Sequence, residues 1–389
     1  MANTFERLFA FIESPQERPW VAMGALAIFF LIGASWMNQA QVLPGVSVSE
    51  TGLNGSITDI IWDDDGMEAL ALVETNGQTD LFARTLLDSG DWGWQALDCG
   101  CNVTSIGGGG DEWVIGGQSG WMGVLTSAGG EISPRSLNWA GEGPDIIALD
   151  GGISSGWIIA GDSSVQHVHT WNGLEVSEGA TYPISEIALN DVVEVAGGAL
   201  IIGYDRSSNP TLGMSSEVLI DAARNSSSAP HLTLLHRGAG SPFHTIVPMD
   251  DSSFIAIIAG GDAIYAVTMD RNIHRVVDSI GIKSIAIDSD EVIWFVNQNG
   301  LYTHNIGDEN SAEIVLPNGV NDDLLGASFS GDNVVMFSSD ASNRVTIDPS
   351  AQHSVLRSLS LLGDLILVMT FIGFAGFGGH ALLRKHELI

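Results

Sequence analysis

The chain has 389 residues, with 47 acidic and 14 basic side chains, and its formal net charge of −33 repels the phosphates of DNA and RNA. This composition excludes nucleic-acid binding as a function. Charged residues make up only 16% of the chain and 47 residues are glycine, which is typical of a turn-rich β protein. The acidic surface fits a protein in a salty medium, and the alternative is a surface that collects Ca²⁺ or a basic partner.

An apolar segment near the N-terminus predicts a transmembrane helix. Residues Trp20–Met37 contain no charged side chain, and the segment is just long enough to cross the hydrocarbon core. Trp20 and Trp36 lie near its two ends, where interfacial aromatic residues are found. A cleaved signal peptide is the alternative, but residues 1–19 are not strongly basic and no clear small-residue cleavage site follows. We therefore expect an uncleaved anchor.

A second apolar segment, residues 359–383, predicts another transmembrane helix near the C-terminus. Arg384–Lys385 follows it directly, and Arg18 precedes the first segment. Positively charged residues flank the cytoplasmic ends of spans, so residues 1–19 and 384–389 are predicted to be cytoplasmic. The region between the spans is then predicted to lie on the extracytoplasmic side of the plasma membrane. The lipid bilayer is one expected partner.

Between the two predicted spans a short pattern recurs, in which a polar turn rich in Gly and Asp is followed by an apolar strand. Other short apolar strands stand before and after each copy, which gives four strands in each period of about 40 residues. This period is the signature of a propeller blade, and it predicts an all-β, seven-bladed β-propeller over residues 55–350. The seven copies begin at Asp65, Gly110, Ser155, Gly197, Ser252, Asp290 and Gly331.

The last repeat has only three evident strands, whereas a strand-like segment without a blade, Gly45–Ser49, lies in the linker formed by residues 38–54. An unpaired sheet edge is a liability, so we expect this segment to pair with the last blade and close the ring. Residues 351–358 then link the propeller to the second span. Both linkers are expected to leave from the face that carries the turns between the first and second strands of each blade.

Two local features interrupt the repeat. Arg206–Ser228, rich in Ser and Asn, is predicted to be an insertion within the fourth blade. The glycine run Gly107–Gly110 is predicted to form a strand-to-strand turn, and because no helix follows it, it is not expected to bind phosphate.

The second copy, DEWVIGGQSGWMGVLTSAGGEI over residues 111–132, resembles the repeat of the bacterial-neuraminidase and photosystem-assembly-factor propellers. In those repeats a Trp-Ala-Val-Gly strand, a Gly turn and a Thr-x-Asp-Gly-Gly stretch recur. The third copy, GWIIAG, fits the same strand, whereas Ala128 stands where the Asp box of that family has an acid. The broader resemblance extends to WD-repeat and YVTN propellers, and it implies the architecture but little of the chemistry.

Only two cysteines occur, Cys99 and Cys101, which are too few for a structural zinc site with four ligands. Outside the cytoplasm they are candidates for a local disulfide, and a pair of thiols is the alternative. Three Asn-x-Ser/Thr sequons between the predicted spans are candidates for glycosylation. They begin at Asn54, Asn102 and Asn225.

No cofactor is expected, and the candidates for ligand binding are few. Asp63, Asp64 and Asp65 lie in a predicted turn, where aspartate is common because its side chain binds backbone N–H groups. As an alternative, these residues are candidates for a calcium site. Trp92 and Trp94, in a run flanked by turn residues, are candidates for exposed aromatic side chains that contact a ligand.

The histidines carry weaker signals. His167 and His169 alternate along a predicted strand and therefore share one face, but two imidazoles are too few for a metal site. His231, His236 and His244 follow the predicted insertion, and no carboxylate stands at a spacing that would indicate a catalytic pair. The sequence contains no nucleophile-elbow, metalloprotease, Walker or Rossmann motif, so no catalytic residue is assigned.

The regular repeat, the two predicted anchors and the absence of catalytic motifs favour a non-enzymatic, membrane-anchored scaffold that binds a protein or glycan outside the cytoplasm. One alternative is an extracytoplasmic hydrolase or lyase of the propeller type, which a buried cluster of acids or arginines in the channel would favour. Another alternative is an accessory subunit of a membrane complex, in which the paired helices matter most.

Overall fold

The computed structural model describes residues 45–352 with nine internal gaps, at residues 64, 110–111, 163, 183–185, 207–215, 226–227, 250–252, 315–323 and 331–332. Ser47–Pro349 forms one compact unit, and the rest of the chain belongs to a second unit. The predicted spans, residues 20–37 and 359–383, lie outside the described residues. Within the described ranges no helix is long and apolar enough to cross a bilayer. The short helices there are η1 Gln118–Gly120 and α3 Pro349–Gln352.

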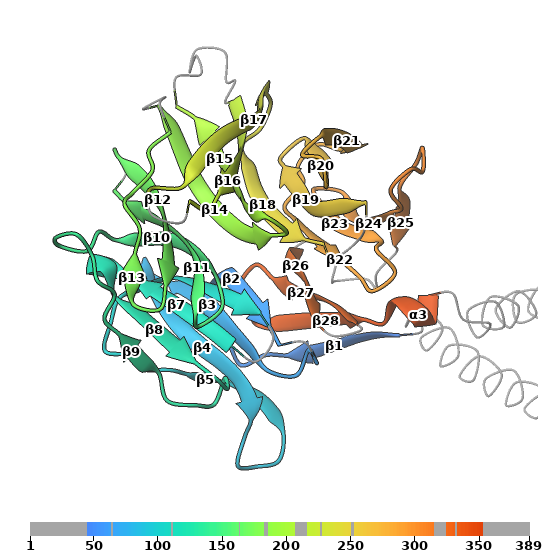
Figure 1. Ribbon diagram of the computed structural model, residues 1–389. Helices are drawn as coiled ribbons and strands as arrows, with labels where there is room; N and C mark the ends of the chain where they lie inside the picture. Colours follow the sequence, from blue (N-terminus) through green and yellow to red (C-terminus); the bar gives the residue numbers. More distant parts are fainter. Residues whose placement is uncertain are drawn as a thin grey trace, which may run out of the picture. The chain divides into compact units, whose positions relative to one another are not determined.

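Seven sheets of four strands make up the compact unit, which confirms the predicted seven-bladed β-propeller (Figure 1). In the first six blades the chain runs outward, so the first strand is innermost and the fourth is outermost. Blade 1 consists of β2 Ser56–Trp62, β3 Ala69–Thr75, β4 Gln78–Leu86 and β5 Trp92–Ala96. Blade 2 consists of β6 Val103–Gly109, β7 Glu112–Gly117, β8 Met122–Leu125 and β9 Ser133–Arg135. Blade 3 consists of β10 Ile146–Gly151, β11 Ser155–Gly161, β12 Gln166–Asn172 and β13 Glu175–Val176.

The next three blades repeat this order. Blade 4 consists of β14 Ile187–Val195, β15 Gly198–Asp205, β16 Ser216–Ala223 and β17 His231–Ala239. Blade 5 consists of β18 Phe243–Pro248, β19 Phe254–Gly260, β20 Ala263–Thr268 and β21 Ile273–Asp278. Blade 6 consists of β22 Ser284–Ile287, β23 Ile293–Asn297, β24 Gly300–His304 and β25 Ala312–Ile314.

Blade 7 combines strands from both ends of the propeller. It contains β26 Leu324–Ser330, β27 Asn333–Ser338 and β28 Asn343–Ile347, with β1 Val46–Glu50 as its outermost strand (Figure 1). The N–H of Thr51, just after β1, donates to the carbonyl of Ser342, just before β28, over 2.9 Å. The predicted pairing of Gly45–Ser49 with the last blade is therefore confirmed. Contacts between each innermost strand and the next, including β26 with β2, complete the ring.

The strand directions define two faces of the propeller. We call the face at which β1 begins and β28 ends the entry face; it carries the turns between the first and second strands and between the third and fourth strands of the blades. The opposite face, called the far face, carries the turns between the second and third strands and the connections from one blade to the next. The two predicted anchors are thus attached to strands that meet the entry face.

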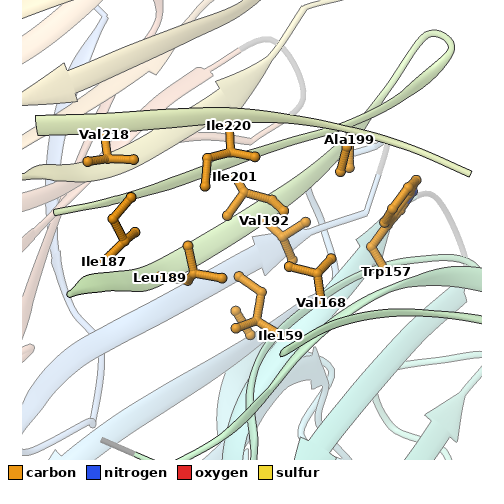
Figure 2. Close-up of a cluster of buried hydrophobic side chains, with 12 residues drawn as sticks. Trp157, Ile159, Val168, Ile187, Leu189, Val192, Ala199, Ile201, Val218 and Ile220 are labelled. Atoms are coloured by element: carbon orange, nitrogen blue, oxygen red, sulfur yellow. The ribbon is translucent and has the colours of Figure 1, made fainter. Parts of the chain in front are cut away.

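The hydrophobic core lies between neighbouring blades. Figure 2 shows the cluster between blades 3 and 4, in which Trp157 and Ile159 of β11 pack with Leu189 and Val192 of β14 and with Ile201 of β15. All five side chains are buried. Second strands covered on both sides become nearly continuous apolar runs. This burial is why the second strands dominate the repeat in the sequence.

The structure corrects two local predictions. Strand β16 lies within Arg206–Ser228, so part of that segment is the third strand of blade 4 rather than an insertion; its apolar residues Val218–Ile220 are buried. The described part of the glycine run Gly107–Gly110 belongs to strand β6 and not to a turn. A Cβ on Gly107 would lie 2.3 Å from the carbonyl oxygen of Leu149 in blade 3, so close packing of inner strands requires glycine there.

Replacing Leu53 tests the closure of the ring, because this side chain lies at the junction of the first and last blades. Leu53 is 4% exposed and packs with Ala71 and Val73 of blade 1 and with Ala341 of blade 7. We expect Leu53→Ala to lower the free energy of unfolding by about 2–4 kcal/mol, since it leaves a cavity at this junction. Denaturant unfolding of the full-length protein measures the loss. Val48→Ala is the control, because Val48 is 50% exposed in β1, and it should cost less than about 0.5 kcal/mol. Equal losses in the two variants would contradict this role of Leu53.

Candidate functional site

The innermost strands share a structural irregularity near the far face. In six of the seven blades the first strand contains a β-bulge, in which one residue is skipped in the pairing with the second strand. A bulge bends the strand and redirects a side chain. The skipped residues are Thr58, Thr104, Ile147, Asn190, His244 and Gly326.

Three bulge side chains contact backbone carbonyls in or just before the first strand of the following blade. The Thr104 hydroxyl donates to the carbonyl of Ile146, and the Asn190 amide donates to the carbonyl of Phe243 over 3.2 Å. His244 Nε2 lies 3.2 Å from the carbonyl oxygen of Ile282. These bonds occupy backbone carbonyls at the inner edge of the ring, where no further strand can pair with them.

Three aspartates line the central channel. Asp59, Asp150 and Asp191 belong to β2, β10 and β14, the innermost strands of blades 1, 3 and 4, and each is half-buried. Their charges interact with one another although blade 1 is not a neighbour of blade 3 or blade 4. The three carboxyls therefore influence one another's pKa although they come from three different blades.

Asp150 shows how these carboxyls are held. One of its oxygens accepts the Glu194 N–H of blade 4 over 2.6 Å, and the other accepts the Gly108 N–H of blade 2 over 3.3 Å. Asp59 accepts the N–H of Ile60 in its own strand over 2.8 Å and is also bonded to the N–H of Ile106 in blade 2. Asp59 and Asp150 thus satisfy backbone groups of neighbouring inner strands, whereas Asp191 accepts the N–H of Val192 in its own strand.

The channel environment makes these carboxyls unusually weak acids. Burial raises the pKa of Asp59 to about 7 and that of Asp150 to about 6. Burial, with the nearby charges of Asp59 and Asp150, raises the pKa of Asp191 to about 8. Hydrogen bonds from backbone N–H groups act in the opposite direction but are outweighed. A carboxyl that exchanges its proton near pH 7 has the property required of a general acid or base.

An open pocket of about 410 Å³ lies on the far face between the inner strands of blades 2 and 3. We call it the blade 2–3 pocket. Its walls come from the far-face ends of β6 and β10 and from the turn between β11 and β12. The lining residues are Thr104, Asp145, Ile146, Ile147, Gly161, Asp162 and Gln166.

Two carboxylates give the blade 2–3 pocket a fixed negative charge. Asp145 accepts the N–H of Ser119 over 2.8 Å. Asp162 accepts the hydroxyl and the N–H of Ser164 over 2.5 and 2.6 Å and the N–H of Val165 over 2.9 Å. These bonds, the Ser164 hydroxyl first, lower the pKa of Asp162 to about 2. The pocket therefore suits a cationic group.

A separate polar cluster joins blades 4 and 5. The buried Glu217 accepts the Tyr265 hydroxyl over 2.8 Å, and the same oxygen lies 2.9 Å from His236 Nε2. Burial, together with the bond to Glu217, raises the pKa of Tyr265. Tyr265 is only 6% exposed, so its hydroxyl is closed to a substrate. This cluster ties two blades together rather than forming a reaction centre.

The structure places the predicted acidic turn between β2 and β3. The Asp63 carboxylate accepts the N–H groups of Met67 and Glu68 over 2.7 and 3.1 Å, which is ordinary turn chemistry. Asp65 is exposed, and Asp64 lies outside the described residues. Across the described parts of the chain no group of three or more His, Cys, Asp or Glu is arranged to hold a metal ion. A calcium site at this turn stays a prediction.

The two tryptophans proposed as ligand contacts have different surroundings. Trp92 is 40% exposed, with the Arg84 guanidinium 5.2 Å from its ring centroid. Trp94 is half-buried, and its ring lies edge-on to Trp62 and Phe337 at centroid distances of 6.2 and 6.4 Å. Trp94 therefore belongs to the junction of blades 1 and 7, and only Trp92 presents a broad surface to solvent.

Cys99 and Cys101 are joined by a disulfide, with their Cα atoms 5.1 Å apart, in the far-face connection between blades 1 and 2. Asn54, Asn102 and Asn225 are all exposed. Glycosylation at these positions stays a prediction.

The predicted histidine pair lies on one face of β12. The rings of His167 and His169 are 6.1 Å apart. His167 Nδ1 lies 2.7 Å from the Thr181 hydroxyl, and His169 Nδ1 lies 3.0 Å from the Ser177 carbonyl. Burial lowers the pKa of His169, so this ring favours the neutral form. Both rings serve to hold the connection that follows blade 3.

The sequence did not single out the channel carboxyls as a group or the two pocket carboxylates. Asp59 and Asp191 stand at the same place in their blades, directly after the bulge residue. An alignment of the seven repeats on their first strands would have revealed this shared position. Glu217, the carboxylate partner of His236, lies in Arg206–Ser228, which the sequence predicts to be an insertion, so sequence reasoning did not find it.

No protein-family model matches the chain, and no curated protein matches it. Solved structures match its fold. YCF48 bound to D1 peptide has a TM-score of 0.52 and 15% identity over 78% of this chain and 96% of that chain. YCF48 from Cyanidioschyzon merolae has a TM-score of 0.56 and 13% identity over 79% and 99%. Virginiamycin B lyase from Staphylococcus aureus has a TM-score of 0.54 and 12% identity over 78% and 99%. Likeness at these identities shows the propeller fold alone.

The raised pKa of Asp191 predicts a pH-dependent effect of its replacement. Its pKa is about 8 in the native state and near 4 when unfolded, so between these values only the unfolded state releases the proton. The native protein therefore loses stability as the pH rises through this window. We expect Asp191→Asn to raise the free energy of unfolding by about 1–2 kcal/mol at pH 8 and to leave it nearly unchanged at pH 4. The asparagine oxygen can still accept the Val192 N–H.

Chemical unfolding of the full-length protein from pH 4 to pH 8 measures this effect as the difference between variant and native protein. The difference is needed because buried histidines such as His169, with a lowered pKa, change stability in the opposite direction below about pH 6.5. Asp80→Asn is the control, because it makes the same chemical change at an exposed position of β4, away from the innermost strands. A pH-independent effect of Asp191→Asn would contradict the prediction.

Proposed function

We propose that this protein is a membrane-anchored scaffold outside the cytoplasm, which binds a protein partner through the far face of its propeller. The observation that carries this proposal is the blade 2–3 pocket, with the carboxylates of Asp145 and Asp162 in its wall. It lies at the far-face ends of the inner strands, and it is open to solvent on the side opposite the chain ends of the propeller.

The chemistry of the pocket favours a basic segment of the partner. Asp162 is ionised at all physiological pH values because its pKa is about 2. Lys or Arg carries the complementary charge, and the half-buried Ile147 in the lining can contact the methylene groups of such a side chain. The net charge of −33 over the whole chain attracts basic partners from a distance at low salt.

A structural neighbour supports a protein partner rather than a glycan. YCF48 was solved with a D1 peptide bound. Propellers of this shape thus offer surfaces on which a peptide can lie. A glycan partner has no comparable support, and it remains the alternative outcome of a binding screen.

Membrane anchoring is the second part of the proposal. It rests on the uncharged segment Trp20–Met37 and on residues 359–383, each with arginine at the flank assigned to the cytoplasm. Because β1 begins and β28 ends at the entry face, anchors at both ends of the chain would hold that face toward the bilayer and leave the far face available.

An extracytoplasmic hydrolase or lyase is the second candidate. Asp59, Asp150 and Asp191 favour it, because pKa values between about 6 and 8 suit proton transfer at neutral pH. Virginiamycin B lyase is among the structural neighbours. Turnover of a glycan, lost in Asp59→Asn and retained in Asp145→Asn, would select this candidate over the scaffold.

The pocket carboxylates provide the test of the scaffold. We expect Asp145→Asn combined with Asp162→Asn to weaken the binding of a lysine- and arginine-rich peptide about tenfold or more, as two attractive charges are lost. Fluorescence anisotropy with the full-length protein measures the change, and raised salt should narrow the difference.

Asp340→Asn is the matched control for this double variant. Asp340 lies in the far-face turn between β27 and β28 and accepts hydrogen bonds from Ser338 and Ser342, which lower its pKa to about 2. It resembles Asp162 in its turn chemistry but lies in another blade. A loss of peptide binding in Asp340→Asn equal to that in the double variant would show that general charge, and not the blade 2–3 pocket, attracts the peptide.

A further inference from the structure

Exposed apolar side chains gather at the turns of the entry face. Eight large apolar residues are exposed among the described residues, and five of them stand at or next to turns of this face. Of these eight described residues, Val165 and Ile280 lie in far-face segments, and Val48 lies in β1. The five are Met67, Leu86, Trp92, Leu174 and Met269.

Three of these residues form one patch on blade 1, which we call the blade 1 patch. Met67, Leu86 and Trp92 are exposed to 53%, 58% and 40%. Leu86 and Trp92 are directly opposite each other in the pairing of β4 with β5. Arg84 joins the patch, because its guanidinium lies over the Trp92 ring and donates to the Met67 carbonyl. Arg84 therefore links the Trp92 ring to the turn that contains Met67.

The short chain segments between the propeller and the predicted anchors limit how far the entry face can lie from the membrane. Ser47 is ten positions after Met37, and Leu359 is ten positions after Pro349. A fully extended chain of this length reaches roughly 35 Å, so two spans would hold the entry face within that distance of the bilayer. We propose that the blade 1 patch inserts into the interfacial region of the membrane that anchors the chain. This inference rests on the anchoring part of the proposed function.

The composition of the patch fits a membrane interface. Tryptophan prefers the level of the lipid head groups, where its ring is partly apolar and its N–H meets water. Arg84 can keep its charged group near the phosphates while its stem lies along apolar surface. Leu86 and Met67 supply the apolar contacts beneath. These features match a surface helix or loop that lies in the interface rather than one that faces open water.

The acidic residues around the patch disfavour contact with anionic lipid. Asp63, Asp65, Asp88 and Asp91 lie in the two turns that frame it. Carboxylates at this position repel anionic head groups, and the two cations there, Arg84 and the nearby Arg344, do not offset four of them. The patch is therefore specific for a zwitterionic surface, and anionic lipid should weaken its contact at low salt.

Single-cysteine labelling tests this inference on the full chain. The two natural cysteines are joined in a disulfide, so a cysteine introduced by Leu86→Cys is the one thiol open to a maleimide fluorophore. Val165→Cys and Ile280→Cys, at exposed far-face positions, are the matched controls. Each labelled protein is reconstituted into phosphatidylcholine vesicles that contain nitroxide lipid as quencher. We expect the Leu86→Cys label to be quenched at least threefold more than either control label.

Flotation of the vesicles after an alkaline wash separates this inference from the proposed anchoring. If the protein floats but the three labels are quenched equally, the blade 1 patch does not meet the membrane and this inference is overturned, while anchoring holds. If the protein does not float, anchoring fails and the inference falls with it. Strong quenching that persists unchanged when half of the lipid is anionic at low salt would overturn the assignment to a zwitterionic surface.

Discussion

Seven innermost strands crowd around one narrow axis, and the need to satisfy their unpaired edges governs much of the structure. Each inner strand pairs with a second strand on one side only, so its other edge presents N–H and C=O groups that require partners. The carboxyls of Asp59 and Asp150 accept such N–H groups, while Thr104 and Asn190 donate to such carbonyls. The same crowding removes water from the carboxyls and raises their pKa. The polar residues of the channel therefore support the ring before they can serve any chemistry.

The parts of the fold that the sequence predicted are those in which one local pattern repeats. Second strands such as β11 and β19 are buried on both sides, so their apolar runs stood out in every blade. Counting strands was enough to pair the segment Gly45–Ser49 with the last blade. Strand β16 was missed because Ser-rich stretches on both sides of it outweighed its short apolar run.

The candidate sites were harder to predict, because each depends on residues from several blades. Asp59, Asp150 and Asp191 influence one another only when the ring closes, and nothing in their spacing along the chain predicts this interaction. The blade 2–3 pocket likewise needs Asp145 from one connection and Asp162 from a turn within the next sheet. Trp92 and Trp94 have similar surroundings in the sequence. In the structure, however, Trp92 is exposed to solvent, whereas Trp94 packs at the junction with blade 7. Alternation along a strand predicts which side a residue faces, but not what lies on that side.

The pairing of β1 with β28 also has a consequence for the time course of folding. Thr51 and Ala341, which are hydrogen-bonded at this junction, are 290 residues apart. At about 5–20 residues per second, translation leaves β1 without its partner for roughly 15–60 s. A strand that waits so long is exposed to wrong pairing with other chains. The sequence of β1, VSVSE, alternates short polar residues with valine and ends in a glutamate, a composition that lowers the tendency to aggregate. The strand that completes the ring is thus also one suited to a long delay on the ribosome.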